Sequence, residues 1–251
     1  MGDSYDVLAG VYDWLVPDQL LTPQGSVAAF AEVVDTLGSG ARVLDCACGT
    51  GQFAVGLALC GFEVVACDAS EAMVERTRQL AGQHGVDLVA LQCEWEQLTA
   101  REPFDAVFCI GNSLTHAAGT ERRRAALQAM AGVLRPGGLL VVTSRNWERV
   151  RAAGSGLQVA DRLVERGGER SLVIYSWTLA EDWDDPHFLD VAVAQWDSAG
   201  GVTSQGERLT FWPFRAGQLD EDLRAAGLQP ESTTYADEAD RYRVTARRRP
   251  G

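Results

Sequence analysis

The stretch Val43-Leu-Asp-Cys-Ala-Cys-Gly-Thr-Gly51 decides the fold of the chain. An apolar run that passes into two closely spaced glycines is typical of a strand that turns into a helix beneath a bound nucleotide. Gly49 and Gly51 permit this tight turn and a close approach of the ligand, because neither carries a Cβ atom. The third glycine of the dinucleotide pattern is missing, since Ala54 occupies its position.

Two acids accompany the glycines. Asp45 lies just before them, and Asp68 follows 23 residues later, at the end of the next predicted strand. A carboxylate at the position of Asp45 repels a pyrophosphate but attracts a cationic sulfonium or amino group. The carboxylate of Asp68 can accept hydrogen bonds from both hydroxyls of an adenosine ribose. The pattern therefore favours a cationic nucleoside over a dinucleotide.

Short apolar strands alternate with helices on both sides of this loop. The predicted strands are Arg42–Cys46, Phe62–Cys67, Asp87–Gln92, Phe104–Ile110 and Leu139–Ser144. The predicted helices are Ser26–Leu37, Gln52–Leu59, Ser70–Gln83, Arg122–Leu134 and Ala216–Ala226. Such alternation implies right-handed crossovers and a parallel sheet that is covered on both faces.

The alternation of predicted strands and helices stops after Ser144. Apolar and polar residues alternate without intervening helices, and glycine pairs separate the runs. The runs are Leu172–Leu179, Leu189–Trp196 and Glu207–Trp212, and a last pair is Glu231–Tyr235 and Tyr242–Ala246. The first three predict an antiparallel insertion, and the last two predict a C-terminal antiparallel hairpin that closes the sheet.

These patterns predict an α/β fold with a Rossmann-like, doubly wound, mostly parallel seven-stranded sheet. At 251 residues the chain is long enough for one such domain with an insertion. We expect a helical cap at 1–40, a ligand-binding core at 41–146, an antiparallel insertion on the substrate side at 147–213, and the last helix with the closing strands at 214–251.

Composition excludes several classes of protein. The net charge of −13 argues against nucleic acid or a membrane as partner, since both require a cationic surface. The chain has no lysine, which excludes Schiff-base chemistry and a Walker-type phosphate loop. Its apolar runs are too short to span a bilayer. Residues Met1–Gly10 lack the features of a secretory signal, so we expect a cytoplasmic protein.

The six cysteines all lie between Cys46 and Cys109. Cys46 and Cys48 are closely spaced, but no second pair of cysteines or histidines follows at zinc-site spacing. We therefore expect no metal and interpret the cysteines as buried, reduced thiols that behave as small apolar residues.

Several stretches resemble a known family. The segment Asp45–Gly51 resembles the first motif of class I S-adenosylmethionine-dependent methyltransferases. More narrowly, four further stretches are similar to glycine and glycine/sarcosine N-methyltransferases. They are Cys109-Ile-Gly-Asn-Ser-Leu-Thr-His116, Arg135-Pro-Gly-Gly-Leu-Leu140, Ser144-Arg-Asn-Trp147 and Arg208-Leu-Thr-Phe-Trp-Pro213. The resemblance extends from about residue 42 to residue 228.

The resemblance implies S-adenosylmethionine as cofactor and S-adenosylhomocysteine as its product. The cofactor contacts that it implies are Asp45, Ala47, Gly49, Thr50, Gly51, Asp68, Ala69, Met73, Glu94, Trp95, Cys109, Ile110, Gly111 and Ser113. Trp95 offers an apolar face on which an adenine can stack, and Glu94 can accept from its exocyclic amine. The alternative is that Trp95 only closes the edge of the sheet.

The resemblance also implies methyl transfer to a small acceptor, chiefly the amine of a small amino acid or a related carboxylated amine. Arg145 would hold the acceptor carboxylate through two parallel hydrogen bonds, Asn112 would add an amide contact, and His116 would remove a proton. The aromatic residues of the insertion, Tyr175, Trp177, Trp196 and Trp212, are predicted to wall the acceptor pocket, and Tyr12 is predicted as a further substrate contact.

Each of these functional roles has a structural alternative. Arg145 can instead form a surface ion pair with Glu148, His116 can be structural, and the aromatic residues can form the core of the insertion. The N-terminal segment also departs from the family pattern, since it contains Tyr5 and Tyr12 but no arginine before Arg42. What holds the methionine carboxylate, and which acceptor is methylated, therefore stay open.

Two other functions compete with this reading. One is an O- or C-methyltransferase of a specialised metabolite, in which Arg145 has no carboxylate to hold. The other is an NAD-type or non-catalytic nucleotide-binding protein, against which the missing third glycine argues. The expected partner is a small-molecule acceptor. A homo-oligomer is compatible with the sequence, which leaves the oligomeric state open.

Overall fold

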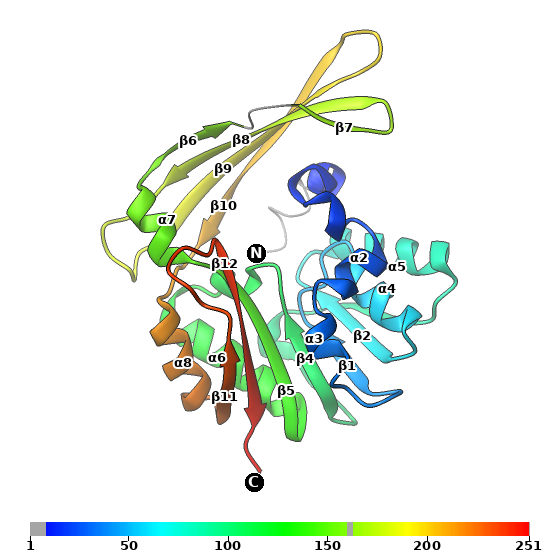
Figure 1. Ribbon diagram of the computed structural model, residues 1–251, viewed down its shortest axis with the longest axis vertical. Coiled ribbons are helices and arrows are strands. Elements are labelled where there is room, and N and C mark those ends of the chain that lie inside the picture. Colours follow the sequence, from blue (N-terminus) through cyan, green and yellow to red (C-terminus); the bar gives the residue numbers. More distant parts are fainter. Residues whose placement is uncertain (1–8, 160–162, 251) are drawn as a thin grey trace.

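The computed structural model describes residues 9–159 and 163–250. Seven strands form its larger sheet, in the order β11-β12-β5-β4-β1-β2-β3 (Figure 1). β12 runs antiparallel to both of its neighbours, and the other pairs are parallel. The strands are β1 (Arg42–Asp45), β2 (Glu63–Asp68), β3 (Val89–Gln92), β4 (Phe104–Cys109), β5 (Leu134–Arg145), β11 (Leu228–Thr233) and β12 (Arg241–Arg248). The predicted fold class is confirmed.

Helices cover both faces of this sheet, because each face carries its own apolar core. One core joins the sheet to α2 (Pro23–Ala28), α3 (Ala31–Val34), α4 (Gln52–Leu59) and α5 (Glu71–His84). The other joins it to α6 (Gly119–Val133) and α8 (Ala216–Ala225). Figure 1 shows these two groups on opposite sides of the strands. The parallel strands β1, β2, β4 and β5 thus have apolar neighbours on both faces, whereas the edge strand β3 buries only Ala90 and leaves Val89 and Leu91 exposed.

The insertion forms a second, antiparallel sheet in the order β10-β9-β8-β6, with β7 paired to β8. Its strands are β6 (Gly156–Val159), β7 (Val164–Arg166), β8 (Glu169–Thr178), β9 (His187–Trp196) and β10 (Val202–Phe211). One face packs on the 3-10 helix η1 (Ala9–Leu15) and on α7 (Trp147–Ala153) through a third apolar core. The second sheet therefore arches over the end of the first, with η1 between them (Figure 1).

The predicted helix Ser26–Leu37 is wrong, because the chain breaks between α2 and α3. Phe30 leaves the helical conformation at the break, with φ −120° and ψ 14°. Its ring packs edge-on against Phe53 at 5.1 Å and Phe108 at 6.4 Å between centroids. Burial of this ring on the sheet outweighs the few hydrogen bonds of a continuous helix.

Two further boundaries differ from the sequence prediction. The insertion begins with α7 instead of a strand, because Asn146 caps the helix by accepting from the backbone N–H of Arg149. β5 begins at Leu134, five residues before the predicted start at Leu139. Phe104 pairs with Leu134 and Ala106 with Leu139, so the residues between them bulge out of the strand.

The N-terminal cap is helical in its described part. η1 and a second 3-10 helix, η2 (Asp18–Leu20), precede α2 and α3. Residues 1–8, which include Tyr5, lie outside the described residues. Among the helices that the structure describes, none is both long and apolar enough to cross a membrane.

Candidate active site

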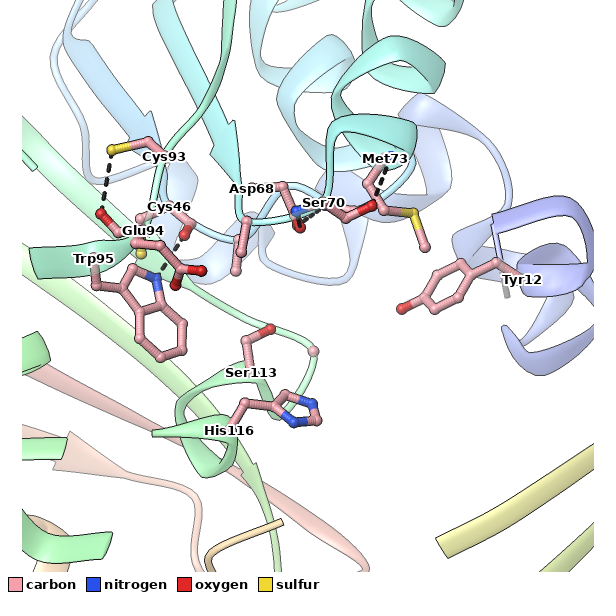
Figure 2. Close-up of a pocket in the computed structure, with 14 residues that line it drawn as sticks. Tyr12, Cys46, Asp68, Ser70, Met73, Cys93, Glu94, Trp95, Ser113 and His116 are labelled. Atoms are coloured by element: carbon pink, nitrogen blue, oxygen red, sulfur yellow. Dashed lines mark hydrogen bonds between the residues drawn. The ribbon is translucent and has the colours of Figure 1, made fainter. Parts of the chain in front are cut away.

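A pocket of about 680 Å3, partly open to solvent, lies where β1, β2 and β4 end. Ligands of open α/β sheets bind at this edge, where the strand order reverses. Figure 2 shows Tyr12 pointing into the pocket from η1, across from Trp95, with Ser113 and His116 along one side. Its lining consists of Tyr12, Cys46, Ala47, Gly49, Asp68, Ala69, Ser70, Met73, Cys93, Glu94, Trp95, Gly111, Ser113 and His116.

Asp45 ends β1 directly before the pocket residues Cys46 and Ala47. Its carboxyl group is 1% exposed, and its Oδ1 accepts from the backbone N–H of Ala47 at 3.4 Å. Its Oδ2 is buried and has no hydrogen-bond partner among the described residues. Burial, the largest cause, raises the pKa of this carboxyl to about 7. A buried carboxylate oxygen without a partner fits a ligand that brings a positive charge or a donor.

Asp68, at the end of β2, is held by the backbone on both sides. Its Oδ2 accepts from the N–H of Gly49 at 2.9 Å, and its Oδ1 accepts from the N–H of Ser70 at 3.0 Å. Burial raises its pKa, and these backbone hydrogen bonds act in the opposite direction. Because each carboxylate oxygen has a second lone pair, the group can still accept from two hydroxyls of a sugar.

The glycine loop is shaped by close packing against α5. Gly51 has φ 90° and is the N-cap residue of α4, and a Cβ there would lie 2.8 Å from the Cα of Thr77 on α5. Gly49 has φ 53°, and its carbonyl accepts from the Thr77 hydroxyl at 3.0 Å. The hydroxyl of Thr50 donates to the side chain of Gln52. Thr50 and Gly51 therefore hold the loop in place and do not line the pocket.

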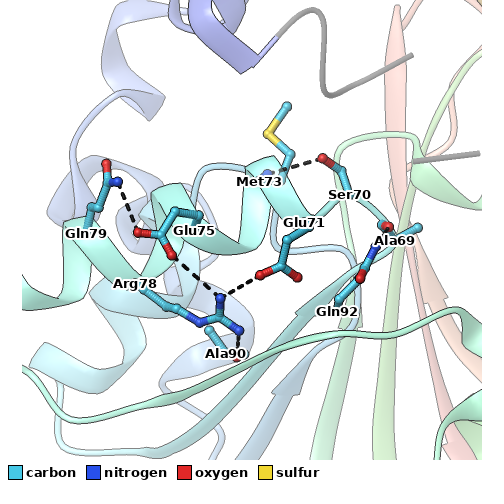
Figure 3. A network of polar contacts seen from close by, with 9 residues as sticks. All are labelled: Ala69, Ser70, Glu71, Met73, Glu75, Arg78, Gln79, Ala90 and Gln92. Carbon is cyan, nitrogen blue, oxygen red and sulfur yellow. Dashed lines mark hydrogen bonds and ion pairs between the residues drawn. The ribbon is translucent and has the colours of Figure 1, made fainter. Parts of the chain in front are cut away.

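The start of α5 forms another wall of the pocket. Ser70 caps the helix by accepting from the N–H of Met73 at 3.2 Å. Gln92 at the end of β3 donates to the carbonyl of Ala69 at 3.0 Å. Figure 3 shows this contact beside the ion pairs of Arg78, which also donates to the carbonyl of Ala90. Ala69, Ser70 and Met73 are thus anchored to β3.

Trp95 begins the short 3-10 helix η3 (Trp95–Gln97) and is fixed by its indole N–H. This N–H donates to the carbonyl of Cys46 at 2.8 Å, across from the end of β1. Glu94 and Gln97 cap each other's backbone in a capping box. The ring of Trp95 is therefore held against the pocket with its polar atom already satisfied.

His116 ends the short 3-10 helix η4 (Ser113–His116) and lines the pocket. Its Nδ1 lies 3.0 Å from the carbonyl oxygen of Thr210 on β10. A carbonyl only accepts, so Nδ1 carries the proton and Nε2 carries the lone pair. Burial lowers the pKa of this imidazole to about 4, so the ring is neutral at pH 7. It joins the two sheets and is a weak base.

Arg145 ends β5, and its guanidinium lies 5.4 Å from the centroid of the Trp177 ring on β8. Its backbone N–H donates to Oδ1 of Asn112 at 2.8 Å, and Nδ2 of Asn112 donates to the Thr115 hydroxyl. Asn112 is 3% exposed and fastens η4 to β5, outside the pocket lining. The alternative ion pair with Glu148 is wrong, since a Glu148 oxygen accepts from the N–H of Ala216 at 2.8 Å instead.

A second arginine lies beside Arg145 and was missed by sequence reasoning. Arg241, at the start of β12, pairs in register with Arg145. Burial raises the pKa of Tyr12 and of Tyr175, and the charge of Arg241 acts against both shifts. The charge of Arg145 also lowers the pKa of Tyr175. The side chains of Tyr12, Tyr175, Arg145 and Arg241 are therefore close enough, in the region between the two sheets, for the arginine charges to act on the tyrosines. The only sequence signal for Arg241 was its position directly before the predicted strand Tyr242–Ala246.

The predicted site residues divide into two groups. The pocket brings together Tyr12, Ala47, Gly49, Asp68, Ala69, Met73, Glu94, Trp95, Gly111, Ser113 and His116. Outside its lining lie Asp45, Thr50, Gly51, Cys109, Ile110, Asn112, Arg145, Tyr175, Trp177 and Trp212. Trp177 belongs to the core of the second sheet, and the backbone N–H of Trp212 donates to the carbonyl of Thr115. For Trp177, the alternative of a role in the core of the insertion holds.

Three lining residues were not assigned from the sequence: Cys46, Ser70 and Cys93. All three follow the end of a strand by one or two residues, which is the signal that could have found them. The cysteines are free thiols, and Cys46, Cys48, Cys67 and Cys109 are buried as predicted. Cys60 is exposed and Cys93 is half-buried, so the prediction of buried thiols is wrong for these two. No group of three metal-ligating side chains occurs in the described parts of the chain.

Comparison with known proteins agrees with this geometry. A family model described as a methyltransferase domain matches residues 43–138. The glycine/sarcosine N-methyltransferase of Aphanothece halophytica is 30% identical over 203 residues, which cover 80% of this chain and 71% of that protein. The residues that the family model matches include the glycine loop and the end of β4.

Two solved structures show the same fold. The CcbJ methyltransferase from Streptomyces caelestis superposes with a TM-score of 0.77 over 98% of each chain, at 22% identity. An amino pentose methyltransferase from Micromonospora echinaspora, solved with bound S-adenosylmethionine, gives 0.74 over 95% of this chain and 96% of that one, also at 22% identity. The match to this relative and to the methyltransferase-domain model shows that the chain belongs to the glycine/sarcosine N-methyltransferase family and is an S-adenosylmethionine-dependent methyltransferase.

Proposed function

We propose that this methyltransferase acts on the amine of a small carboxylated amine, such as glycine or sarcosine. The observation that carries the proposal is the position of Arg145. Its guanidinium lies between the two sheets, over Trp177 and within electrostatic reach of Tyr175. A planar guanidinium binds a carboxylate through two parallel hydrogen bonds and so orients the neighbouring amine. The relative from Aphanothece halophytica bears the name of an enzyme for two such amines.

The proposed cofactor position follows from the two acids. Asp68 accepts from the ribose hydroxyls, and the partnerless Oδ2 of Asp45 faces the positive charge of the methionine part. The ring of Trp95 stacks on the adenine, and Glu94 accepts from its exocyclic amine. When bound, S-adenosylmethionine supplies an electrophilic methyl group on a cationic sulfur.

The chain contributes positioning and exclusion of water more than acid–base chemistry. An amine attacks only in its unprotonated form, and a neutral His116 with a pKa of about 4 is too weak a base to deprotonate an ammonium group. The proton therefore leaves to water before the amine is enclosed. Arg145 then aligns the amine, while η1 and the second sheet cover the site.

Replacement of Arg145 tests this proposal. Arg145→Ala should raise the KM of the acceptor roughly ten- to a hundredfold, because a charge-assisted contact is lost. The Kd of S-adenosylhomocysteine should change less than about twofold, because Asp45 and Asp68 are untouched. Arg145→Lys should give an intermediate KM. The matched control is Arg149→Ala, which removes an exposed guanidinium of α7 that pairs with Asp240. An acceptor KM that is the same in Arg145→Ala and the parent protein would rule the proposal out.

The position of Arg241 favours a second candidate, an amine that carries two anionic groups. Arg145 and Arg241 lie directly opposite each other on one antiparallel pair, where side chains point to the same face. Two guanidiniums on one face suit a dicarboxylate or a phosphorylated amine. This candidate predicts that Arg241→Ala raises the KM of aspartate more than that of glycine. An equal effect on both acceptors favours the smaller substrate.

A further inference from the structure

The second sheet has an inner face, which packs on η1 and α7 through the third apolar core, and an outer face. Figure 1 shows the outer face turned away from η1. Side chains alternate between the two faces along each strand, so the core and the register together identify the outer residues. They are Leu157 and Val159 of β6, Arg170, Leu172, Ile174, Ser176 and Thr178 of β8, Phe188, Asp190, Ala192, Ala194 and Trp196 of β9, and Val202, Ser204, Gly206, Arg208 and Thr210 of β10.

This outer face is apolar although it is exposed. An antiparallel sheet with one solvated face usually carries polar side chains on that face. Here Leu157, Val159 and Val202 are 67%, 48% and 57% exposed, and aliphatic or small side chains fill the space between them. None of these described outer residues belongs to any of the three apolar cores. A continuous apolar surface of this kind marks an interaction site.

The charges on the outer face balance one another. Arg208 donates to the two carboxylate oxygens of Asp190 at 2.7 and 2.9 Å, and Arg170 pairs in register with Glu165 of β7. The described strands thus carry two acids and two arginines on this face, whereas the whole chain has a net charge of −13. Most of the surface therefore repels a second copy of the chain, and this face does not. Because it lacks a cationic excess, the face does not suit nucleic acid or an anionic membrane.

The shape of the outer face is complementary to itself. At its centre β6 and β8 carry the large side chains Val159, Leu172 and Ile174, and β9 and β10 carry the small residues Ala192, Ala194, Ser204 and Gly206. Ile174 pairs in register with Ala192, and Ala192 pairs with Gly206, so a ridge and a hollow lie side by side at the same height. Rotation by 180° about an axis between β8 and β9, parallel to the strands, places the ridge of one copy over the hollow of another.

We propose that the outer face of the second sheet binds a second copy of this chain, face to face about this two-fold axis. Ile174 of each copy then packs on Ala192 of the other copy, and Val159 packs on Gly206. The face measures roughly 30 Å along the strands and 20 Å across them, so the pair buries roughly 1,200 Å2, which is enough for a specific interface. A two-fold pair covers both faces and is closed. The inner face keeps its contacts with η1 and α7, so the interface is independent of the proposed acceptor.

The test is the oligomeric state of the full-length protein, measured by sedimentation velocity over a range of concentrations up to about 100 µM. The parent protein should sediment as a dimer. Ala192→Glu places a carboxylate in the hollow, opposite an apolar ridge, and should raise the Kd of the dimer at least about a hundredfold. The matched control is Val89→Glu, which puts the same charge on an exposed apolar position at the edge strand β3 of the other sheet and should leave the dimer intact.

An exchange of side chains tests the two-fold register and does not depend on a new charge. Ala192→Ile sets ridge against ridge and Ile174→Ala removes the ridge, so each should raise the Kd of the dimer roughly tenfold. The double variant restores one large and one small side chain at each contact and should return the Kd to within about threefold of the parent value.

Far-ultraviolet circular dichroism checks that each variant is folded, and the exchange decides the question if Ala192→Glu does not fold. A parent protein that stays monomeric at about 100 µM overturns the inference. So does a dimer that Val89→Glu breaks and Ala192→Glu leaves intact, or a double variant that dimerises no better than the single ones.

Discussion

Asp45 combines near-complete burial with a carboxylate oxygen that has no partner among the described residues. Burial raises the pKa of this carboxyl to about 7, so ionisation of Asp45 destabilises the folded protein. A cation bound at Oδ2 reverses that effect. The proposed function therefore predicts that cofactor binding, pH and stability are coupled at Asp45.

The first prediction concerns pH. Below about pH 7 the Asp45 carboxyl is protonated and loses its attraction for a cationic ligand. The affinity for S-adenosylmethionine should therefore fall as the pH is lowered from 8 to 6, approaching a tenfold loss per unit of pH well below pH 7. Calorimetry at a series of pH values measures this. In Asp45→Asn the affinity should be lower throughout and nearly independent of pH, and a parallel pH dependence in the variant would show that another group is responsible.

The second prediction concerns stability without cofactor. The pKa of Asp45 is about 7 in the folded chain against an ordinary 3.8, so folding favours the protonated carboxyl. The contribution of Asp45 to the free energy of unfolding therefore falls as the pH rises from about 4 to about 7. Asp45→Asn removes this cost and should raise the Tm, more at pH 8 than at pH 5.5. Thermal unfolding of the two proteins measures it. An equal gain at both pH values, or a lower Tm, would argue against a raised pKa.

At the scale of single residues, the sequence was most informative about the residues of the glycine loop and the acid that accompanies it. Asp45, Asp68 and the glycines follow from a strand–turn–helix pattern within one short stretch, and the structure brings Asp68 to the N–H of Gly49. Arg241 was not predictable, because it meets Arg145 only through the register of β12 on β5. Register depends on the packing of the whole sheet.

Among the elements, α6 and α8 are joined by a buried ion pair. Asp222 on α8 is 0% exposed and accepts from Nε of Arg123 at 2.7 Å and from Nε of Arg124 at 2.6 Å. The guanidinium of Arg123 is buried with it and also lies 4.9 Å from the centroid of the Phe214 ring. Two helices that are far apart in sequence are thus held together by one carboxylate.

The third prediction is that Asp222→Ala lowers the free energy of unfolding by about 3–5 kcal/mol, because it leaves the buried charge of Arg123 uncompensated. Urea denaturation measures the change. The control is Asp220→Ala on the same helix, which breaks only the exposed pair with Arg224 and should cost less than about 1 kcal/mol. A similar loss of unfolding free energy in the two variants would contradict the conclusion that the buried ion pair holds α6 and α8 together.

Elements with a strong local pattern were predicted well, and short or exposed ones were not. The predicted α4 coincides with Gln52–Leu59, because its apolar residues and the flanking glycines mark both ends. β6 was missed because all four of its residues are exposed, so no alternation of burial marks it. The break at Phe30 depends on a contact with Phe108, which is 78 residues away in sequence.

At the scale of the whole molecule, the pocket lies at the end of the parallel sheet, and η1 and the antiparallel sheet lie over that end (Figure 1). The glycine loop and Asp68 come from the parallel sheet, whereas Tyr175 and Trp177 come from the antiparallel insertion, with Arg145 at the junction. The cofactor half was predictable because it is built from consecutive strand ends. The acceptor half was less so, because it depends on how the insertion packs over η1. The proposed function accordingly predicts that specificity for the acceptor is set where the two sheets meet.

The most direct test of the proposed activity is the ratio of kcat/KM for glycine to that for glycinamide, measured at pH 8 as S-adenosylhomocysteine released and N-methylated product formed. Glycinamide keeps the amine and replaces the carboxylate that Arg145 is proposed to hold. We predict that glycine is preferred at least about tenfold, even though the amine of glycinamide is less basic and more of it is unprotonated. Equal use of the two, or a methyl group found on oxygen or carbon, would contradict the proposal.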